Sequence, residues 1–216
     1  MIKAIIFDMD GLLVDSEPYW KIAEKICFGK LGLNLNDELL RQVMGFRLSE
    51  VVEHWYNFQP WGEKNFETVE ADVLETVKQL IIDNANALPG VIQTLELCKN
   101  NGYKIALASS SAKSLINVVV DKLNIRNYFD LLVSAEFEPY GKPHPSVFIT
   151  TANKLNVLPT ECLVFEDSVN GMIAAKAARM KCIVVPEAEK QLEPYWELAN
   201  QKLKTLEEFK LEMVEL

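Results

Sequence analysis

The chain has 216 residues, of which 49% are hydrophobic and 25% are charged, a composition that is ordinary for a soluble globular protein with a core of its own. Its net charge of −9 gives no electrostatic reason to expect binding to nucleic acid or to an anionic membrane. The N-terminus "MIKAIIFDMDG" lacks the pattern of a signal peptide, and no apolar run approaches the ~20 residues of a membrane span.

The first predicted element is a strand at 4–7, "AIIF", whose apolar run is typical of a strand buried on both faces. Residues from about 18 to 85 then look helical, with helices expected at 18–33, 49–58 and 65–85 and no convincing strand among them. This region is bracketed by Ser16-Glu17-Pro18 and Leu88-Pro89-Gly90, which are plausible hinges because proline and glycine interrupt helices.

The rest of the chain alternates between strands and helices. Apolar runs predict strands at 104–109, 131–135, 162–166 and 182–185, and helical periodicity predicts helices at 91–99, 114–125 and 145–157. Leu206 to Leu216 reads as a short acidic helix. The alternation predicts an α/β fold, a doubly wound Rossmann-like parallel sheet. We therefore expect a core domain of residues 1–16 and 87–216, and an inserted small α-helical cap domain of residues 17–86.

Residues with unusual chemistry follow four of the predicted strands: Asp8 and Asp10, Ser109 to Ser111, Lys142, and Glu166-Asp167. Singly, each has an ordinary explanation as a turn, a helix cap or a solvated charge. All four groups at one edge of one sheet are improbable by chance, because ligands bind at the carboxyl edge of such folds.

The residue types in these four groups fit phosphate chemistry. Asp8, Glu166 and Asp167 gather carboxylates that a hard divalent cation such as Mg²⁺ would neutralise. Ser109 and the backbone N–H groups of "SSSA" can hold a phosphate at a turn before a helix. Lys142 adds the local positive charge that an acidic protein needs beside an anionic substrate.

In order and spacing, "DMDGLLVDSEP", "ALASSS", "GKPHP" and "VFEDSVNG" resemble the four motifs of the haloacid dehalogenase superfamily. They look most like its β-phosphoglucomutase-like branch, within which "WYNFQPW" and "KPHPSVF" are similar to bacterial hexitol and 2-deoxyglucose-6-phosphate phosphatases. The resemblance runs from Ile5 to about Pro186. It implies a monomeric, Mg²⁺-dependent phosphatase of a small phosphorylated sugar or polyol. The lack of a signal-peptide pattern and of a membrane-spanning run makes a cytoplasmic protein the expectation, and the net charge of −9 predicts no nucleic-acid or membrane partner.

The resemblance also implies a role for each motif residue. Asp8 would be the nucleophile that forms an aspartyl-phosphate, and Asp10 the general acid and then base. Asp8, Asp167 and the Asp10 carbonyl would hold Mg²⁺, with Glu166 close by or ligating through water. The phosphoryl group would be held by Ser109, Ser110 and Lys142.

The segment "MGFR" at 44–47 resembles the substrate-specificity loop of the branch. Gly45, Phe46 and Arg47 are therefore the predicted substrate-binding residues of the cap. Arg47 could pair with a hydroxyl or a distal phosphate, and its alternative is a solvated charge at the start of a helix.

Three other functions fit parts of the pattern. A β-phosphoglucomutase is the nearest, but mutases carry a histidine just after the first motif, where "DSEPYWK" has Trp20. A 2-haloacid dehalogenase needs neither Asp10 nor the Glu166-Asp167 pair. A non-catalytic binding protein on this fold should have lost a nucleophile, an acid or a metal ligand, whereas every one is present.

Overall fold

A six-stranded parallel sheet forms the centre of the molecule. The computed structural model describes residues 1–43 and 45–215, and within these ranges the strand order is β3-β2-β1-β4-β5-β6. The strands are β1 (Ala4–Phe7), β2 (Lys104–Ser109), β3 (Leu131–Ser134), β4 (Cys162–Glu166), β5 (Lys181–Val184) and β6 (Gln201–Lys202). The predicted fold class is confirmed, with the five predicted strands correct to within a residue at each end; the short β6 was not predicted.

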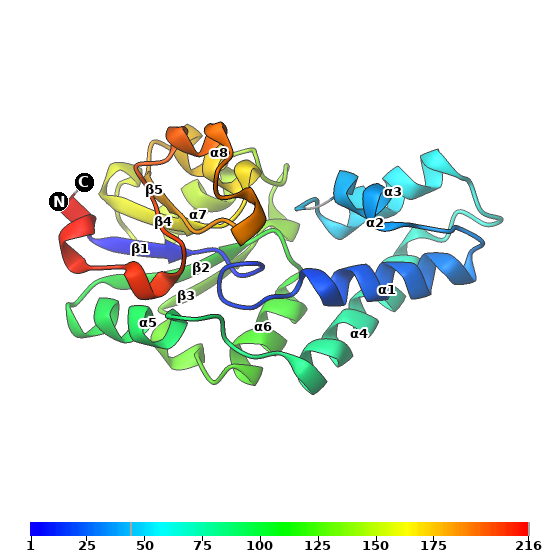
Figure 1. Cartoon of the computed structure of the whole chain (residues 1–216), viewed down its shortest axis with the longest axis horizontal. Coiled ribbons are helices and arrows are strands. Elements are labelled where there is room, and N and C mark those ends of the chain that lie inside the picture. The colour runs from blue at the N-terminus through cyan, green and yellow to red at the C-terminus, as the bar shows by residue number, and fades with distance from the viewer. Residues whose placement is uncertain (44, 216) are drawn as a thin grey trace.

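Helices cover both faces of this sheet (Figure 1). Helices α5 (Val91–Asn100) and α6 (Lys113–Lys122) lie on one face, and α7 (Ser146–Lys154) and α8 (Val169–Ala177) lie on the other. Successive strand side chains point to opposite faces. Ile5 and Phe7 accordingly join the α5–α6 side of the core, whereas Ala4 and Ile6 join the α7–α8 side.

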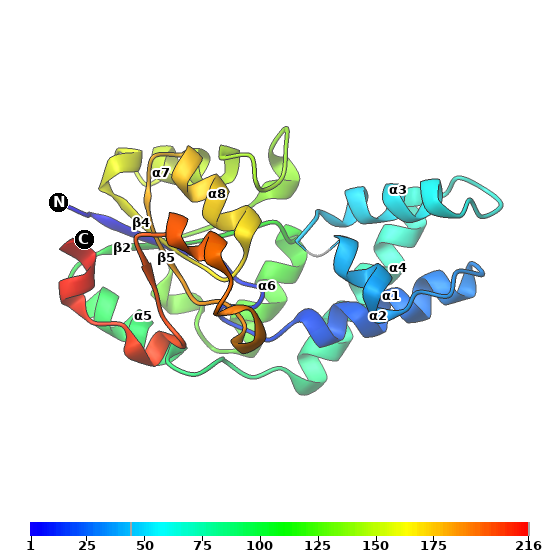
Figure 2. The same cartoon turned by 45° about the horizontal axis from the view of Figure 1, so that its top comes forward.

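The remaining helices lie beyond one end of the sheet, as both views show (Figure 2). They are α1 (Glu17–Lys30), α2 (Asp37–Leu40), α3 (Leu48–Phe58) and α4 (Phe66–Asn84). Helix α4 packs against α1, α3 and α6. The chain leaves the sheet and returns along neighbouring segments, because Leu88 N donates to Leu13 O at 3.0 Å and Val14 bridges to Ala87.

The C-terminal segment corrects one prediction. Instead of a single acidic helix, residues 206–208 and 211–215 form two separate 3₁₀ turns. Phe209 lies between them in extended backbone, with its side chain buried edge-on against Phe165 at a centroid separation of 5.0 Å. Burying this ring requires the extended residue, which interrupts the helix; Leu216 lies outside the described residues.

The strand order of the sheet reverses direction at β1. β1 lies between β2 and β4, so the chain winds outward in both directions from β1, and ligands of doubly wound sheets bind at the carboxyl end of this switch point. The four cysteines are buried and free. No helix in the described ranges is both long and apolar enough to cross a membrane.

Candidate active site

Two acidic residues follow the switch-point strand. Asp8 continues β1, since its N–H donates to Phe165 O at 3.0 Å, and its side chain is buried. The chain then turns at Gly11, which has φ +73°, a left-handed conformation that glycine adopts without steric cost. A Cβ on Gly11 would overlap the Asp167 carboxylate. Glycine therefore lets the turn that carries Asp10 approach the end of β4.

Lys142 links these acids to the end of β4. Its Nζ donates to Asp8 Oδ1 and to Glu166 Oε1, each at 2.6 Å, and to Ala108 O at 3.2 Å. The side chains of Lys142 and Glu166 are 4% and 0% exposed. An ammonium group has three N–H donors, so the protein already uses all three. Lys142 was predicted to hold phosphate; the structure shows it holding the Asp8 carboxylate.

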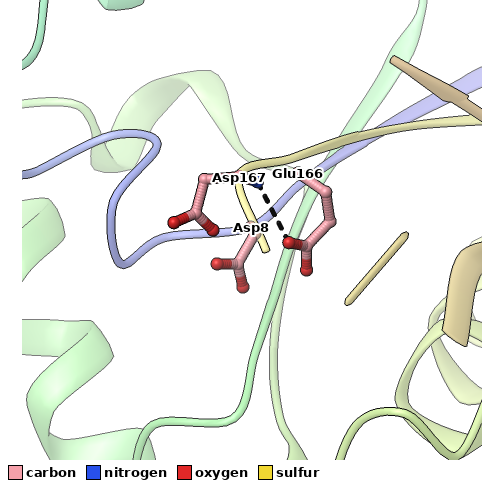
Figure 3. Close-up of side chains that lie close together, drawn as sticks. All are labelled: Asp8, Glu166 and Asp167. Carbon is pink, nitrogen blue, oxygen red and sulfur yellow. Dashed lines mark hydrogen bonds between the residues drawn. The ribbon is translucent and has the colours of Figure 1, made fainter. Parts of the chain in front are cut away.

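Glu166 has little capacity left for a metal ion. Its Oε1 accepts from Lys142, and its Oε2 accepts from Asp167 N, Ser168 N and Ser168 Oγ at 2.9 to 3.1 Å. The contact with Asp167 N is the dashed line in Figure 3. These contacts orient Lys142 and the turn that presents Asp167.

The carboxylates of Asp8, Glu166 and Asp167 gather in one place (Figure 3). Each offers an oxygen within 4.8 Å of the other two. Burial raises the pKa of Asp8 to about 8, with Lys142 opposing the change and Glu166 and Asp10 adding to it. Burial, followed by Glu166 and Asp8, raises the pKa of Asp167 well above its usual range. Three carboxylates facing one lysine leave an excess of negative charge, and hard dications bind such oxygen ligands.

Two of these carboxylates have oxygens available for a cation. Asp8 Oδ2 and the Asp167 carboxylate receive no hydrogen bond from the described residues. The residues therefore fit a divalent cation, with Asp8 and Asp167 as the accessible ligands.

Asp10 is held by donors from three parts of the chain. Its Oδ1 accepts from Ser16 Oγ at 2.5 Å and from Trp20 Nε1 at 3.4 Å. Its Oδ2 accepts from Ser111 Oγ at 2.7 Å and from Ser109 Oγ at 3.3 Å. Sequence reasoning did not find the contacts of Asp10 with Ser16, Trp20 and Ser111, because nothing in their spacing pairs them with an acid on another segment.

Ser110 has a hydroxyl that the protein leaves unused. Its Oγ is buried and has no hydrogen-bond partner among the described residues, and the residue lines the cavity described below. A buried hydroxyl without a partner costs free energy. A bound anion would satisfy it.

A cavity of about 360 Å³ lies between the carboxyl edge of the sheet and helices α1 to α3. It brings together eight of the predicted site residues, namely Asp8, Asp10, Gly45, Phe46, Ser109, Ser110, Lys142 and Asp167. Glu166 lies behind Lys142 and does not line the cavity. Met44 lies outside the described residues.

Arg47 does not line this cavity. Its guanidinium donates to Glu50 Oε1 at 2.7 and 3.1 Å and to the carbonyl of Glu138 at 3.1 Å. Its side chain also packs on Gly141, where a Cβ would come within 3.1 Å of Arg47 Cγ. In this structure Arg47 thus connects the start of α3 to the loop before Lys142.

Glu24 in α1 is one of the cavity residues that were not predicted from the sequence. It is buried, and its Oε2 accepts from Trp55 Nε1 at 3.2 Å. A signal existed, since Trp20, Ala23, Cys27 and Phe28 share a helical face with Glu24. A lone acid on an apolar helix face needs a reason to be buried.

Residues 5–185 match the family of haloacid dehalogenase-like hydrolases. The chain belongs to this family. The hydrolase is 45% identical over 208 residues to hexitol phosphatase B of Escherichia coli O157:H7, covering 96% of the chain and 94% of that relative. It is 31% identical over 189 residues to a phosphorylated carbohydrates phosphatase of Thermotoga maritima, covering 84% of each.

Solved structures agree with this assignment. β-Phosphoglucomutase from Clostridium difficile superposes on the hydrolase with a TM-score of 0.87 at 27% identity, covering 100% of this chain and 96% of that one. With the named phosphatases at up to 45% identity over nearly the whole chain, the hydrolase is a phosphatase.

Proposed function

We propose that the hydrolase removes the phosphate from a small phosphorylated sugar or sugar alcohol, with Mg²⁺ as cofactor and through a phosphorylated Asp8. One observation carries the proposal: Asp8 faces the cavity with Oδ1 fixed by Lys142 and with Oδ2 free of donors from the described residues, two positions before Asp10. The relatives named for hexitol and carbohydrate phosphates support the substrate class.

In the first half-reaction Asp8 is the nucleophile. A carboxylate oxygen of Asp8 forms a bond to phosphorus while the bond from phosphorus to the ester oxygen breaks. Lys142 keeps the other oxygen in place at 2.6 Å. Fixing the attacking group in this way lowers the entropic cost of reaching the transition state.

Asp10 supplies and then removes protons. As the ester oxygen leaves, a protonated Asp10 gives it the proton that makes it an alcohol. Asp10 then accepts a proton from the water that attacks phosphorus, which releases phosphate and frees Asp8. Such transfers contribute about 10²–10⁴-fold to a rate. The four donors to Asp10 fix its carboxyl group in the cavity.

The phosphoryl group would lie between the β2 turn and Lys142. The unpaired Ser110 Oγ is one donor toward it, and Ser109 is a second once its contact with Asp10, which is 3.3 Å long, is exchanged. Lys142 provides a fixed positive charge beside the reacting oxygens. Mg²⁺, held by Asp8, Asp167 and the Asp10 carbonyl, would neutralise charge on the phosphate and so reduce its repulsion from Asp8.

Residues 17–86 would act as a cap domain over the core formed by 1–16 and 87–216. The adjacent segments that leave and re-enter the sheet near Leu13 and Leu88 support this division, and so does the position of Phe46 on the cavity wall. A cap that opens to admit the substrate and then closes would exclude water from the site while the phosphoryl group is transferred.

The second candidate function is a β-phosphoglucomutase, because the enzyme from Clostridium difficile shares the fold over the whole chain. Both functions start from a phosphorylated Asp8 and differ in the acceptor, which is water for the phosphatase and a second sugar hydroxyl for the mutase. Trp20 contacts Asp10 at the position where mutases are expected to carry histidine, and this favours hydrolysis.

A phosphate-release screen tests the proposal. The purified protein is incubated with sorbitol 6-phosphate, 2-deoxyglucose 6-phosphate and β-glucose 1-phosphate, with Mg²⁺ or with EDTA. We expect free phosphate from the first two with Mg²⁺ and none with EDTA. Glucose 6-phosphate formed from β-glucose 1-phosphate without free phosphate would establish the mutase instead, and release that persists in EDTA would exclude the metal.

A further inference from the structure

We propose that Glu24 is a specificity-determining residue, whose carboxylate accepts a hydrogen bond from a hydroxyl of the substrate's carbon chain and disfavours a second phosphate at that end. The inference rests on the proposed function and narrows its substrate class to monophosphates with a hydroxylated, uncharged tail.

Glu24 is unusual among the residues of the first four helices. Within the described part of 17–84 it is the one charged side chain that is buried. Burying a carboxylate is costly unless it is paired. Among the described residues Glu24 forms no ion pair, and its hydrogen-bond partner is the neutral indole of Trp55. Burial raises the pKa of Glu24 to about 7, and the Trp55 N–H only partly opposes this.

The two oxygens of Glu24 have different surroundings. Oε2 accepts from Trp55 Nε1 at 3.2 Å, which fixes the orientation of the carboxyl group. Oε1 has no donor among the described residues, and Glu24 lines the cavity. An oriented carboxylate with one unused oxygen on a cavity wall is an acceptor for a ligand O–H.

The same cavity is also lined by buried apolar side chains from residues 17–58, including Leu40, Val43 and Val51. A few polar groups in a mostly apolar pocket are the ones that orient a ligand. The other charged cap residues on the cavity are more exposed: Lys21 pairs with Glu17, and Arg41 is exposed to solvent.

The helix also sets how far Glu24 lies from the reacting end of the cavity. Trp20 contacts Asp10, and Glu24 follows Trp20 by four residues in α1. Side chains at this spacing are neighbours on one helix face, with Cβ atoms about 5–6 Å apart. Glu24 therefore meets a part of the substrate beyond the ester oxygen at Asp10, where a hexitol carries hydroxyls and a bisphosphate carries its second anion.

Two phosphate esters distinguish a role of Glu24 in recognising the substrate from a role in maintaining the fold. Sorbitol 6-phosphate and hexyl phosphate both carry a six-carbon chain and one phosphate, but only the first has hydroxyls. The readout is the ratio of their kcat/KM values for the wild type, Glu24→Gln, Glu24→Leu and a control. The control is Phe28→Leu, a buried position one turn further along α1 that does not line the cavity.

We expect Glu24→Leu to lower kcat/KM for sorbitol 6-phosphate by roughly tenfold to a hundredfold, the range for a lost hydrogen bond to a charged group. The kcat/KM for hexyl phosphate should change little in Glu24→Leu, and the ratio of the two kcat/KM values should stay the same in Phe28→Leu. Glu24→Gln keeps one oxygen, which accepts from Trp55 Nε1, and places an NH₂ group where Oε1 was; this group can donate to a hydroxyl oxygen, and the charge is removed. This variant should retain most activity on sorbitol 6-phosphate and raise turnover of fructose 1,6-bisphosphate several-fold.

Equal losses on both esters in Glu24→Leu, or a wild type that does not distinguish the two, would overturn the assignment of Glu24 while leaving the phosphatase in place. If Glu24→Leu does not fold, the near-isosteric Glu24→Gln decides, because an unchanged bisphosphate rate overturns the charge argument. Absence of Mg²⁺-dependent release from every ester, p-nitrophenyl phosphate included, would instead reject the proposed function and the inference with it.

Discussion

Removing the charge of Glu24 should change how the stability of the protein depends on pH. Glu24 is 7% exposed, and burial raises its pKa from the ordinary 4.5 to about 7. Since each tenfold change in proton affinity is worth 1.36 kcal/mol, the ionised side chain costs the folded state about 3 kcal/mol.

The direction of the effect follows from proton binding. Between the unfolded pKa of 4.5 and the folded pKa of about 7, the folded state keeps a proton that the unfolded state has released. The unfolded state then binds fewer protons, so the free energy of unfolding falls as the pH rises. The free energy of unfolding is therefore unaffected by the titration of Glu24 at pH values below its unfolded pKa. It falls as the pH rises and reaches its full loss once the pH exceeds the folded pKa.

Urea unfolding of the wild type and Glu24→Gln at about pH 5 and pH 8 measures this. Glutamine does not titrate, so other groups cancel in the difference between the two proteins. Between these pH values the wild type should lose roughly 2–3 kcal/mol relative to Glu24→Gln, which is about 1 M in urea midpoint. Parallel pH profiles for the two proteins would contradict this prediction, because Glu24 would then have an ordinary pKa.

Two further substitutions test the packing and charge of the site. In Gly171→Ala the new Cβ would overlap the wholly buried Glu166 carboxylate. We expect this variant to lose about 1–3 kcal/mol of stability and to have a lower kcat. In the matched control, Gly29→Ala in α1, no atom lies within 4 Å of the new Cβ, and this variant should gain a few tenths to about 1 kcal/mol. Equal urea midpoints for the two variants would contradict this account of the close approach. Lys142→Met leaves Asp8 and Glu166 without their shared cation and should cost about 3–5 kcal/mol at alkaline pH. The cost should be smaller at lower pH, where the carboxyl of Asp8, whose pKa is about 8, is protonated. Thermal denaturation across pH checks it, and a pH-independent loss would argue against charge as the cause.

The sheet could be predicted from sequence because its strands are short apolar runs buried on both faces. "AIIF" and "CLVFE" have no polar face that would allow another placement, and the structure has β1 and β4 at those residues. The C-terminal helix was predicted wrongly because its composition is helical, whereas the decisive contact is tertiary: Phe209 packs on Phe165, a residue 44 positions earlier.

The acidic and basic site residues could also be predicted, because each follows a strand that ends at the same edge. Their pairing could not. Lys142 gives all its donors to Asp8, Glu166 and Ala108, a distribution that depends on the path of the loop before α7. The donors to Asp10 come from segments that meet only in three dimensions, and Glu24 becomes notable only when Trp55 and the cavity are placed beside it.

The proposed mechanism requires that Asp8 carries the phosphoryl group during turnover. The most direct measurement is an acid quench, within the first turnover, of the protein mixed with Mg²⁺ and sorbitol 6-phosphate labelled with ³²P, followed by mapping of the labelled peptide. We expect label on Asp8 in the wild type, and neither label nor phosphate release in a folded Asp8→Asn variant. Label on another residue, or phosphate release by Asp8→Asn at the wild-type rate, would contradict it.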